Sequence, residues 1–334
     1  MPRLKKIKVH IFLRKPFKFE NHSIEKLFHS IIKKKNDEFK FILLECPFYS
    51  SGFLKRFYNC VWAFFKQGDI NHVSGDTNFI SIFLDKNKTI NTFHDCYNLR
   101  HYTGLKKIIF KLFWFYIPIK RSRYITAVSD FTKRELKELL NTNKEIKVIP
   151  NFLTENHYIK KKFKNKNCAL VIGTTKNKNI DKIFLAVKKT IFELLIVGKL
   201  NCKQKNFLLK NNIKYKNFIN ISEKKIIELY NKSFVLVNPS LYEGFGLTNL
   251  EAQKMGIPVI TSNISPMKEI MGDSAILVNP NDEHEIYRNI NKIHRDKLLR
   301  NKIIIKGYKN ILDYDINFAK KKYFDLYRKM LNEK

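Results

Sequence analysis

The stretch "NPSLYEGFGLTNLEAQKMGIPVITSN", residues 238–263, decides the fold of this 334-residue chain. It begins where an apolar run typical of a strand ends, and it closes on a second such run, "IPVITS". Between them, "LTNLEAQKMG" has a helical pattern with Gly256 and Pro258 as stop signals. The loop "LYEGFG" therefore joins the carboxyl end of a strand to the first turn of a helix. Open α/β sheets bind their ligands at that edge.

Two glycines and two glutamates make this loop a candidate binding site. Gly244 and Gly246 let the backbone bend and approach a ligand, and the N–H groups of the first helical turn favour phosphate. A carboxylate only accepts hydrogen bonds and repels phosphate, so Glu243 and Glu251 suit the hydroxyls of a sugar and a ribose flanking a diphosphate. The alternative is structural, because Thr248 and Glu251 match a capping box in which Glu251 only satisfies a backbone donor.

Strand and helix patterns alternate through the rest of the chain. The expected strands are "KIKVHIFL", "FKFILLE", "INHVSG", "TINTFHD", "YITAVS", "IKVIPN", "CALVIG", "FELLIVG", "NFINIS", "SFVLVNPS", "IPVITS" and "AILVNP". The segment "DFTKRELKELLN" is an expected helix capped by Ser129 or Asp130. This alternation predicts the α/β class, with two Rossmann-like domains of parallel strands facing across a cleft.

The pattern also suggests where the domains begin and end. We expect an N-terminal domain over residues 1–152, a lysine-rich linker over 153–167 and a C-terminal domain over 168–315. A final amphipathic helix over 316–334 is expected to pack back on the N-terminal domain. The basic N-terminus leads into an apolar run broken by Lys8, which we interpret as the first strand and not a signal peptide.

Composition narrows the class of protein without naming it. The five cysteines form no C-x-x-C pair, so we expect a reducing cytoplasm and neither disulfides nor a zinc site. No window of 18 uncharged apolar residues is present, so no membrane span is expected. The formal charge of +34 has two explanations: compositional bias that enriches Lys, Asn and Ile, or attraction to a polyanion such as an anionic membrane or nucleic acid.

The glutamate loop resembles the signature of the retaining GT-B glycosyltransferases of family 4. That signature is E-x7-E within PS-x-x-EGFG-x-x-x-LEA-x-x-x-G-x-PV. The matching positions are Pro239, Ser240, Glu243, Gly244, Phe245, Gly246, Leu250, Glu251, Ala252, Gly256, Pro258 and Val259, followed by Glu269, Gly272 and Pro280. A looser similarity covers residues 90–285, including "TFHD", "TAVSDFTKREL" and "LVIGTTKNKNID".

The resemblance implies a nucleotide-sugar site in the C-terminal domain. Glu251 is implied to bind the ribose hydroxyls, and Glu243 the donor sugar near its reacting edge. The backbone of Gly244, Phe245, Gly246 and Leu247 is implied to cradle the diphosphate.

A second loop, after the strand that ends at Gly173, is implied to complete this site. Lys178 falls on the family's basic position and would neutralise the leaving phosphate, with Lys176 as a substitute; otherwise Lys178 is one more solvated lysine. The family often has Arg after the glycine, whereas Thr174 stands here, so the chain departs from the family pattern in this part of the diphosphate clamp.

His94 matches a family histidine that reaches towards the donor sugar from the N-terminal domain, although a lone histidine at a strand end is often structural. Ser129 and Asn151 lie at comparable strand ends. Catalysis is then expected from His94, Glu243 and Lys178. Retention would follow from front-face attack, since no carboxylate is obviously placed as a covalent nucleophile. No Asp-x-Asp motif ends a strand, so we expect no metal and no cofactor; cations and the helix terminus stabilise the diphosphate.

The acceptor half departs from the family pattern, because the loop after the first strand contains no glycine. His22, Ser23 and Glu25 are acceptor candidates there, with a simple helix start as the alternative, and Gly75 and Asp76 end another strand.

Two aromatic and basic segments, "SSGFLKRFYNCVWAFFKQ" and "GLKKIIFKLFWFYIPIKRSRY", suggest either core helices or docking on an anionic inner leaflet.

These features lead to one main hypothesis and two alternatives. The main one is a transferase at the inner face of the plasma membrane. It moves a hexose from a UDP- or GDP-sugar to a lipid-linked glycan acceptor in bacterial surface polysaccharide or lipopolysaccharide synthesis. A second is a soluble sugar synthase or phosphorylase of the same fold. A third is a basic nucleic-acid-binding protein, but no recognition motif of that kind is visible, so we expect no nucleic-acid partner.

Overall fold

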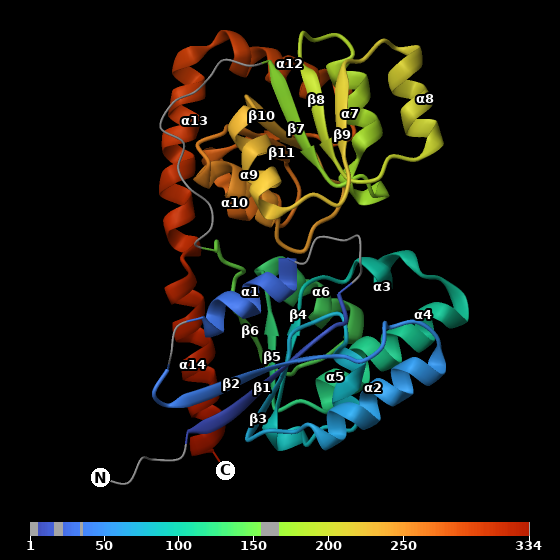
Figure 1. Cartoon of the computed structure of the whole chain (residues 1–334), viewed down its shortest axis with the longest axis vertical. Coiled ribbons are helices and arrows are strands. Elements are labelled where there is room, and N and C mark those ends of the chain that lie inside the picture. Colours follow the sequence, from blue (N-terminus) through green and yellow to red (C-terminus); the bar gives the residue numbers. More distant parts are fainter. Residues whose placement is uncertain (1–5, 17–22, 34–35, 155–166, 334) are drawn as a thin grey trace. The chain divides into compact units, whose positions relative to one another are not determined.

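The computed structural model describes residues 6–16, 23–33, 36–154 and 167–333. The chain forms two compact units (Figure 1). The first comprises Met1–Thr154 together with Ile316–Lys334, and the second comprises Glu155–Asp315. Most of the expected linker, residues 155–166, lies outside the described residues.

The first unit is built on a six-stranded parallel sheet with the order β2-β1-β3-β4-β5-β6. Its strands are β1 (Ile7–Leu13), β2 (Phe39–Glu45), β3 (Ile70–Val73), β4 (Thr89–Phe93), β5 (Tyr124–Ala127) and β6 (Ile146–Val148). Its helical elements are α1 (Ser23–Ile32), α2 (Phe53–Phe65), α3 (Tyr97–His101), α4 (Gly104–Lys111), α5 (Ile117–Lys120), α6 (Asp130–Leu140) and α14 (Ile316–Asn332), with the 3₁₀ turns η1 (Asn78–Ile82) and η2 (Lys86–Lys88) and a π-helical turn η3 (Leu112–Tyr116).

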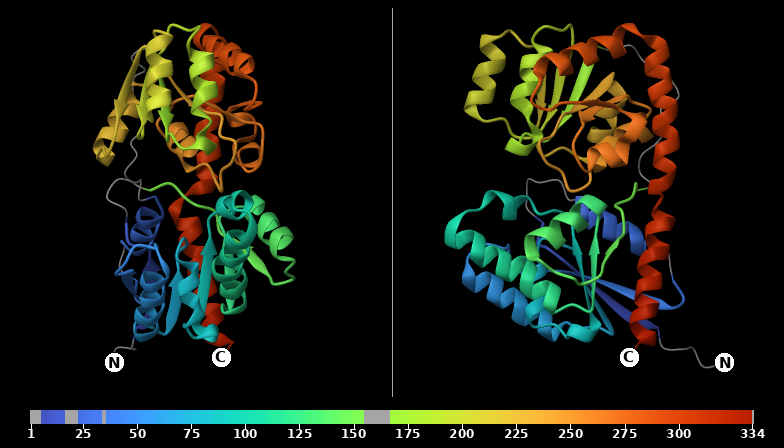
Figure 2. Two further views of the ribbon diagram at one scale, coloured as in Figure 1. Left: turned by 90° about the vertical axis from the view of Figure 1, so that its right-hand side faces the viewer. Right: turned by 180° about the vertical axis from the view of Figure 1, so that it is seen from behind.

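Helices cover both faces of this sheet (Figure 2). Alternate residues of a strand point to opposite faces, so Phe12 of β1 packs in a core cluster with Cys60 of α2 and Val73 of β3. His72, one residue earlier in β3, instead contacts Tyr327 of α14. The last helix of the chain is thus part of the core of the first unit.

The second unit repeats this plan with the strand order β12-β11-β10-β7-β8-β9. Its strands are β7 (Cys168–Ile172), β8 (Glu193–Val197), β9 (Tyr215–Phe218), β10 (Val235–Asn238), β11 (Val259–Ser262) and β12 (Ile276–Val278). Its helical elements are α7 (Ile180–Val187), α8 (Cys202–Lys210), α9 (Glu223–Lys232), α10 (Leu247–Lys254), α11 (Met267–Met271), α12 (Glu283–Arg295), α13 (Lys297–Asn310) and the 3₁₀ turns η4 (Lys176–Lys178), η5 (Gly272–Ser274) and η6 (Ile311–Tyr314).

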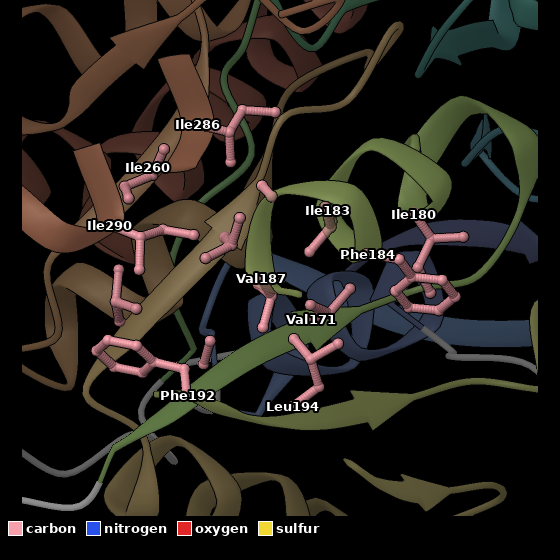
Figure 3. Close-up of a cluster of buried hydrophobic side chains, with 14 of the residues drawn as sticks. Val171, Ile180, Ile183, Phe184, Val187, Phe192, Leu194, Ile260, Ile286 and Ile290 are labelled. Atoms are coloured by element: carbon pink, nitrogen blue, oxygen red, sulfur yellow. The ribbon is translucent and has the colours of Figure 1, made fainter. Parts of the chain in front are cut away.

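One face of the second sheet carries the hydrophobic cluster drawn in Figure 3. Val171 of β7 and Leu194 of β8 meet Ile183 and Phe184 of α7, and Ile290 of α12 joins them. All five side chains are at most 2% exposed. Strands buried in this way have nearly continuous apolar sequences. These strands could therefore be predicted from the sequence.

The two parallel sheets confirm the expected α/β fold. Several strands are shorter than expected, because residues such as Pro239 lie beyond the ladder. The strand expected at "NFINIS" is wrong in position: β9 runs from Tyr215 to Phe218. Its partner β8 ends at Val197, opposite Phe218, and Gly198 then turns away with φ of 134°. The residues after Phe218 therefore have no strand to pair with.

Candidate functional site

The candidate site of the second unit is built where the central strands β10 and β7 end. These two strands are neighbours in the sheet, so the loops that follow them meet at its carboxyl edge. The Leu241 N–H donates to the carbonyl oxygen of Asn177 at 2.8 Å, and the Asn177 amide donates to the carbonyl oxygen of Tyr242 at 3.1 Å. The two loops are thereby held as one surface.

This surface brings together two of the predicted catalytic residues. Lys178 Nζ lies 2.5 Å from Glu243 Oε1, and the Ser240 hydroxyl donates to the same carboxylate oxygen at 2.8 Å. The two charged side chains are 17% and 14% exposed, so water screens the pair only in part. Lys178 is therefore oriented by a named partner and is not simply a solvated lysine.

Gly173 makes room for the Lys178 side chain. Its φ is +95°, and a Cβ added there would lie 2.9 Å from Lys178 Cε and Cγ. Thr174, which follows, donates its hydroxyl to the carbonyl oxygen of Lys199 at 2.8 Å. Its side chain thus braces the loop after β8, while Lys176 is exposed.

Glu251 occupies a different position from the one that a capping box requires. Helix α10 begins at Leu247 with Gly246 as its N-cap residue, so Thr248 lies inside the helix and the capping-box alternative is wrong. Glu251 Oε2 instead accepts a hydrogen bond of 2.9 Å from the hydroxyl of Tyr230 on α9. Burial, and then the nearby Glu251 carboxylate, raise the pKa of Tyr230 well above its usual value. The Tyr230 hydroxyl therefore stays protonated as a donor.

In the glycine-rich loop the aromatic ring of Phe245 is buried, so this residue can offer a ligand only its backbone. Gly246 has φ of 91°, a conformation that favours glycine. Phe245 is 5% exposed and packs edge-on against Tyr314, with ring centroids 5.6 Å apart. The part that Phe245 can play toward a ligand is therefore that of its main chain.

His94 lies in the first unit, directly after β4. Its Nε2 is 2.7 Å from the carbonyl oxygen of Ser74, which can only accept, so Nε2 carries the proton. Burial is the main cause that lowers the pKa of His94. The ring is therefore neutral at pH 7, and its Nδ1 is a hydrogen-bond acceptor.

The other predicted residues of the first unit have diverse positions. Asp76 lines a pocket of about 230 Å³ together with His94 and its neighbour in the sequence, Asp95. Glu25 is buried and receives a hydrogen bond of 2.7 Å from Arg14, so it supports this region from within. His22 lies outside the described residues, as does the side chain of Ser23. Ser129 caps α6 by accepting from the Thr132 N–H at 3.1 Å.

Some contacts at the site were not predictable from the motif. Tyr230 is the clearest case, since it comes from a helix that precedes β10 and has no recognisable pattern around it. Ser240 belonged to the matched motif, but nothing in the sequence indicated its bond to Glu243. The Asn177 bridge was also missed.

Comparison with known proteins identifies the family. Sequence models of two families match consecutive halves of the chain: "Glycosyltransferase Family 4" over residues 7–156 and "Glycosyl transferases group 1" over residues 154–310. The chain belongs to the family 4 glycosyltransferases. The resemblance of the glutamate motif to the family 4 glycosyltransferases is thereby confirmed.

Curated relatives of this family 4 glycosyltransferase include enzymes of O-antigen synthesis. The O-antigen chain mannosyltransferase RfbU of Salmonella typhimurium is 31% identical over 215 residues, and O-antigen chain mannosyltransferase B of Escherichia coli is 25% identical over 231 residues. Each alignment covers 61% of this chain and 60% of the relative. The chain thus spans less than two thirds of the length of these relatives.

Solved structures of low sequence identity share the GT-B fold of this family 4 glycosyltransferase. Sucrose-phosphate synthase from Thermosynechococcus elongatus has a TM-score of 0.78 at 13% identity, over 98% of this chain and all of that one. Anabaena HepE in complex with UDP and glucose has a TM-score of 0.76 at 12% identity, over 96% of this chain and 99% of that one.

The described residues contain neither a membrane-spanning helix nor a cluster of metal-ligand side chains. No helix there combines the length and apolar character that crossing a membrane requires. No group of three or more His, Cys, Asp or Glu side chains there could hold a metal ion.

Proposed function

We propose that this protein transfers a hexose from a nucleotide-sugar to a glycan acceptor in the synthesis of a surface polysaccharide or lipopolysaccharide. Mannose is the first sugar to test, because the relatives named above are mannosyltransferases. UDP and GDP are both candidate carriers. One observation carries the proposal: Lys178 and Glu243 meet at the carboxyl edge of a parallel sheet, beside the helix that bears Glu251.

The Lys178–Glu243 contact gives the site a definite chemistry. A lysine and a carboxylate at 2.5 Å neutralise each other. An incoming diphosphate competes for Lys178, which frees the Glu243 carboxylate to accept hydrogen bonds from the hydroxyls of the donor sugar. Glu251, held by Tyr230, accepts from the ribose hydroxyls. Gly173, Thr174 and Lys176, together with the backbone of Gly244 to Leu247, complete the proposed diphosphate cradle.

The reaction then needs stabilisation of the departing diphosphate. The bond between the anomeric carbon and the diphosphate oxygen breaks, and its electron pair goes to the diphosphate. An acceptor hydroxyl oxygen bonds to the same face of that carbon, and its proton passes to the departing oxygen, so the anomeric configuration is retained. Lys178 and preorganised backbone amides stabilise the new charge, and we propose that no metal ion is needed. His94, neutral with Nδ1 as acceptor, positions a donor-sugar hydroxyl.

The acceptor side of the proposal rests on the surface of the first unit. Phe53 and Phe65 of α2 are 77% and 75% exposed, and Leu105 of α4 is 71% exposed. Lys55, Lys106 and Lys107 lie beside them in the sequence. Exposed apolar side chains with interleaved lysines are what binding to an anionic lipid surface requires. We therefore propose peripheral attachment to the inner face of the plasma membrane and a lipid-linked acceptor.

A soluble synthase or phosphorylase remains the second candidate, because sucrose-phosphate synthase shares the fold. That likeness does not choose between acceptors, whereas the exposed aromatic side chains favour the lipid. A small free sugar acting as the acceptor without any lipid would support the second candidate.

A transfer assay tests the main proposal. Purified protein is incubated with labelled UDP- and GDP-hexoses and a bacterial lipid extract, and the anomer of the product is read by NMR. We expect retained configuration, full rate in EDTA, and a kcat about 100-fold lower in Lys178→Gln because the leaving group loses its cation. The exposed Lys203→Gln is the matched control. Strict dependence on Mg²⁺ or Mn²⁺ would refute metal independence, and equal rates in both variants would refute the assigned site.

A further inference from the structure

A pocket of about 230 Å³ in the first unit has features that donor binding does not use. It opens beside His94, and its wall combines cations with aromatic rings. The cations are Arg14, Lys15 and Arg56, and the rings include Tyr102, Phe110 and Trp114. Two carboxylates, Asp76 and Asp95, also line it.

Arg56 of α2 is held in this wall by two contacts, and part of its guanidinium remains able to donate hydrogen bonds to a ligand. Its guanidinium carbon lies 4.7 Å from the ring centroid of Trp114, and its Nη2 donates to the carbonyl oxygen of Ser50 at 3.0 Å. Burial lowers the pKa of Arg56, yet a guanidinium remains charged at neutral pH. Within the described part of the chain, its Nη1 has no hydrogen-bond partner.

The charges of the pocket are only partly compensated. Arg14 is met by Glu25 at 2.7 Å and by Asp76. Lys15 donates to the carbonyl oxygen of Pro47 at 2.8 Å. Among the described residues, no carboxylate lies within 4.0 Å of the cationic nitrogens of Lys15 or Arg56. A partly buried cation without a counter-charge favours an anion that can replace its lost water.

The helices that form this wall also carry exposed apolar side chains. On α2, Phe53 and Phe57 flank Arg56 and stack with ring centroids 6.2 Å apart. On α4, Leu105 and Ile108 are 71% and 64% exposed. Figure 1 and Figure 2 show α2 and α4 side by side. An apolar surface therefore adjoins a cationic pocket.

We propose that this pocket binds the phosphate or diphosphate of an amphiphilic acceptor, whose apolar chain lies against α2 and α4. Arg56 and Lys15 contact the anion, and the glycan beyond it extends past His94. The assignment rests on the proposed transferase function, because it names the acceptor class for that reaction. A membrane phospholipid offers the same phosphate chemistry, so the test must separate the two sources.

Isothermal titration calorimetry on the full chain distinguishes the amphiphilic acceptor from a membrane phospholipid. It uses four probes, each kept below its critical micelle concentration. Farnesyl diphosphate carries both groups, inorganic pyrophosphate only the anion, farnesol only the chain, and dihexanoyl phosphatidylglycerol a membrane headgroup. We expect farnesyl diphosphate to bind tightest. Arg56→Gln should weaken it about tenfold or more, because a charge-assisted hydrogen bond is lost. Lys137→Gln, which removes an exposed charge from α6 of the same unit, should change it less than about twofold. Lys15→Gln is the second test variant if Arg56→Gln does not fold.

Three results would overturn the assignment: no binding of farnesyl diphosphate, equal weakening by Arg56→Gln and Lys137→Gln, or tighter binding of phosphatidylglycerol or farnesol. The affinity of wild type and Arg56→Gln for UDP and GDP is measured in parallel. We expect it to be the same in both proteins, since Arg56 is not part of the second unit. Absence of nucleotide binding in wild type would refute the transferase proposal, and this outcome is distinct from failure of the pocket.

Discussion

At the scale of single residues, the orientation of His94 depends on Gly75, which has no side chain to collide with the histidine ring. Gly75 follows β3 with φ of +123°, and a Cβ built there would lie 2.4 Å from His94 Cδ2. The ring packs against the glycine while its Nε2 bonds to Ser74, the preceding residue. Gly75 was a candidate of the acceptor half in the sequence. In the structure it leaves the space that the His94 ring occupies.

Replacing Gly75 with alanine should therefore displace His94. We expect Gly75→Ala to lose about 1–3 kcal/mol of unfolding free energy, from overpacking and a strained φ, and to lose most transfer activity. Gly52→Ala is the matched control, because Gly52 also has positive φ but nothing within 4 Å of its added Cβ. Urea unfolding and kcat are measured for both variants. Full activity in Gly75→Ala would show that the position of His94 is not important.

Residue identities at the candidate site were predictable, but their partners were not. The motif gave Glu243, Glu251 and Lys178 because their spacing in the sequence is fixed. The hydroxyl of Tyr230 approaches Glu251 only after α9 packs beside α10, and such a contact leaves no local pattern in the sequence. The same holds for the bond from Ser240 to Glu243, which depends on the exact bend of one loop.

At the scale of elements, α14 is anchored to the first sheet by buried polar groups. His72 Nδ1 lies 2.7 Å from the Tyr327 hydroxyl, and its Nε2 lies 2.8 Å from Thr92 Oγ1. Phe324 of the same helix stacks on Phe41 of β2 with centroids 5.5 Å apart. Amphipathic periodicity predicted this helix. It could not indicate that Tyr327 contacts His72, a buried histidine of the sheet.

Stability should fall in acid because of His72. Burial lowers the pKa of His72 to about 3, whereas the unfolded chain binds a proton near pH 6.5. The unfolded state thus binds more protons between these values, so unfolding free energy falls as the pH drops. From pH 7 to pH 5 we expect a loss of about 2 kcal/mol from this group. Urea unfolding at both pH values measures it.

The matched variants for this pH test are His72→Asn and His29→Gln. His72→Asn should be less stable at pH 7, yet its loss from pH 7 to pH 5 should be smaller than that of wild type. His29 is exposed, so His29→Gln should keep the wild-type difference. An unchanged pH difference in His72→Asn would show that the ring is protonated in the folded protein.

Helices α2 and α4 carry the membrane proposal. Vesicles with anionic lipid should bind the protein at low salt and release it at high salt. Phe53→Ser and Leu105→Ser should each lower the partition coefficient about tenfold, because each removes an insertable side chain. Leu298 on α13 is 84% exposed, and Leu298→Ser is the control. Equal binding by all three variants, or binding unaffected by salt, would contradict this role.

At the scale of the whole molecule, hydrophobic periodicity was sufficient to predict two parallel sheets. The glutamate motif was sufficient to predict the family. The twelve strands were expected from apolar runs, and all have counterparts among the described residues. The position of β9 was wrong because the end of a strand depends on its partner, β8, which lies elsewhere in the sequence. The proposed acceptor pocket was the least predictable part, because it joins α2, α4 and the loop after β4 without any shared motif.

The most direct test of the account is nucleotide binding by wild type and Glu251→Gln. Glutamine still accepts a hydrogen bond from Tyr230, but it cannot offer two carboxylate oxygens to a ribose. Glu228→Gln, at an exposed carboxylate on α9, is the control. Calorimetry with UDP, GDP and their hexose conjugates should give one nucleotide that binds wild type and Glu228→Gln equally and Glu251→Gln about tenfold more weakly. Binding of no nucleotide, or equal binding by all three proteins, would contradict the account.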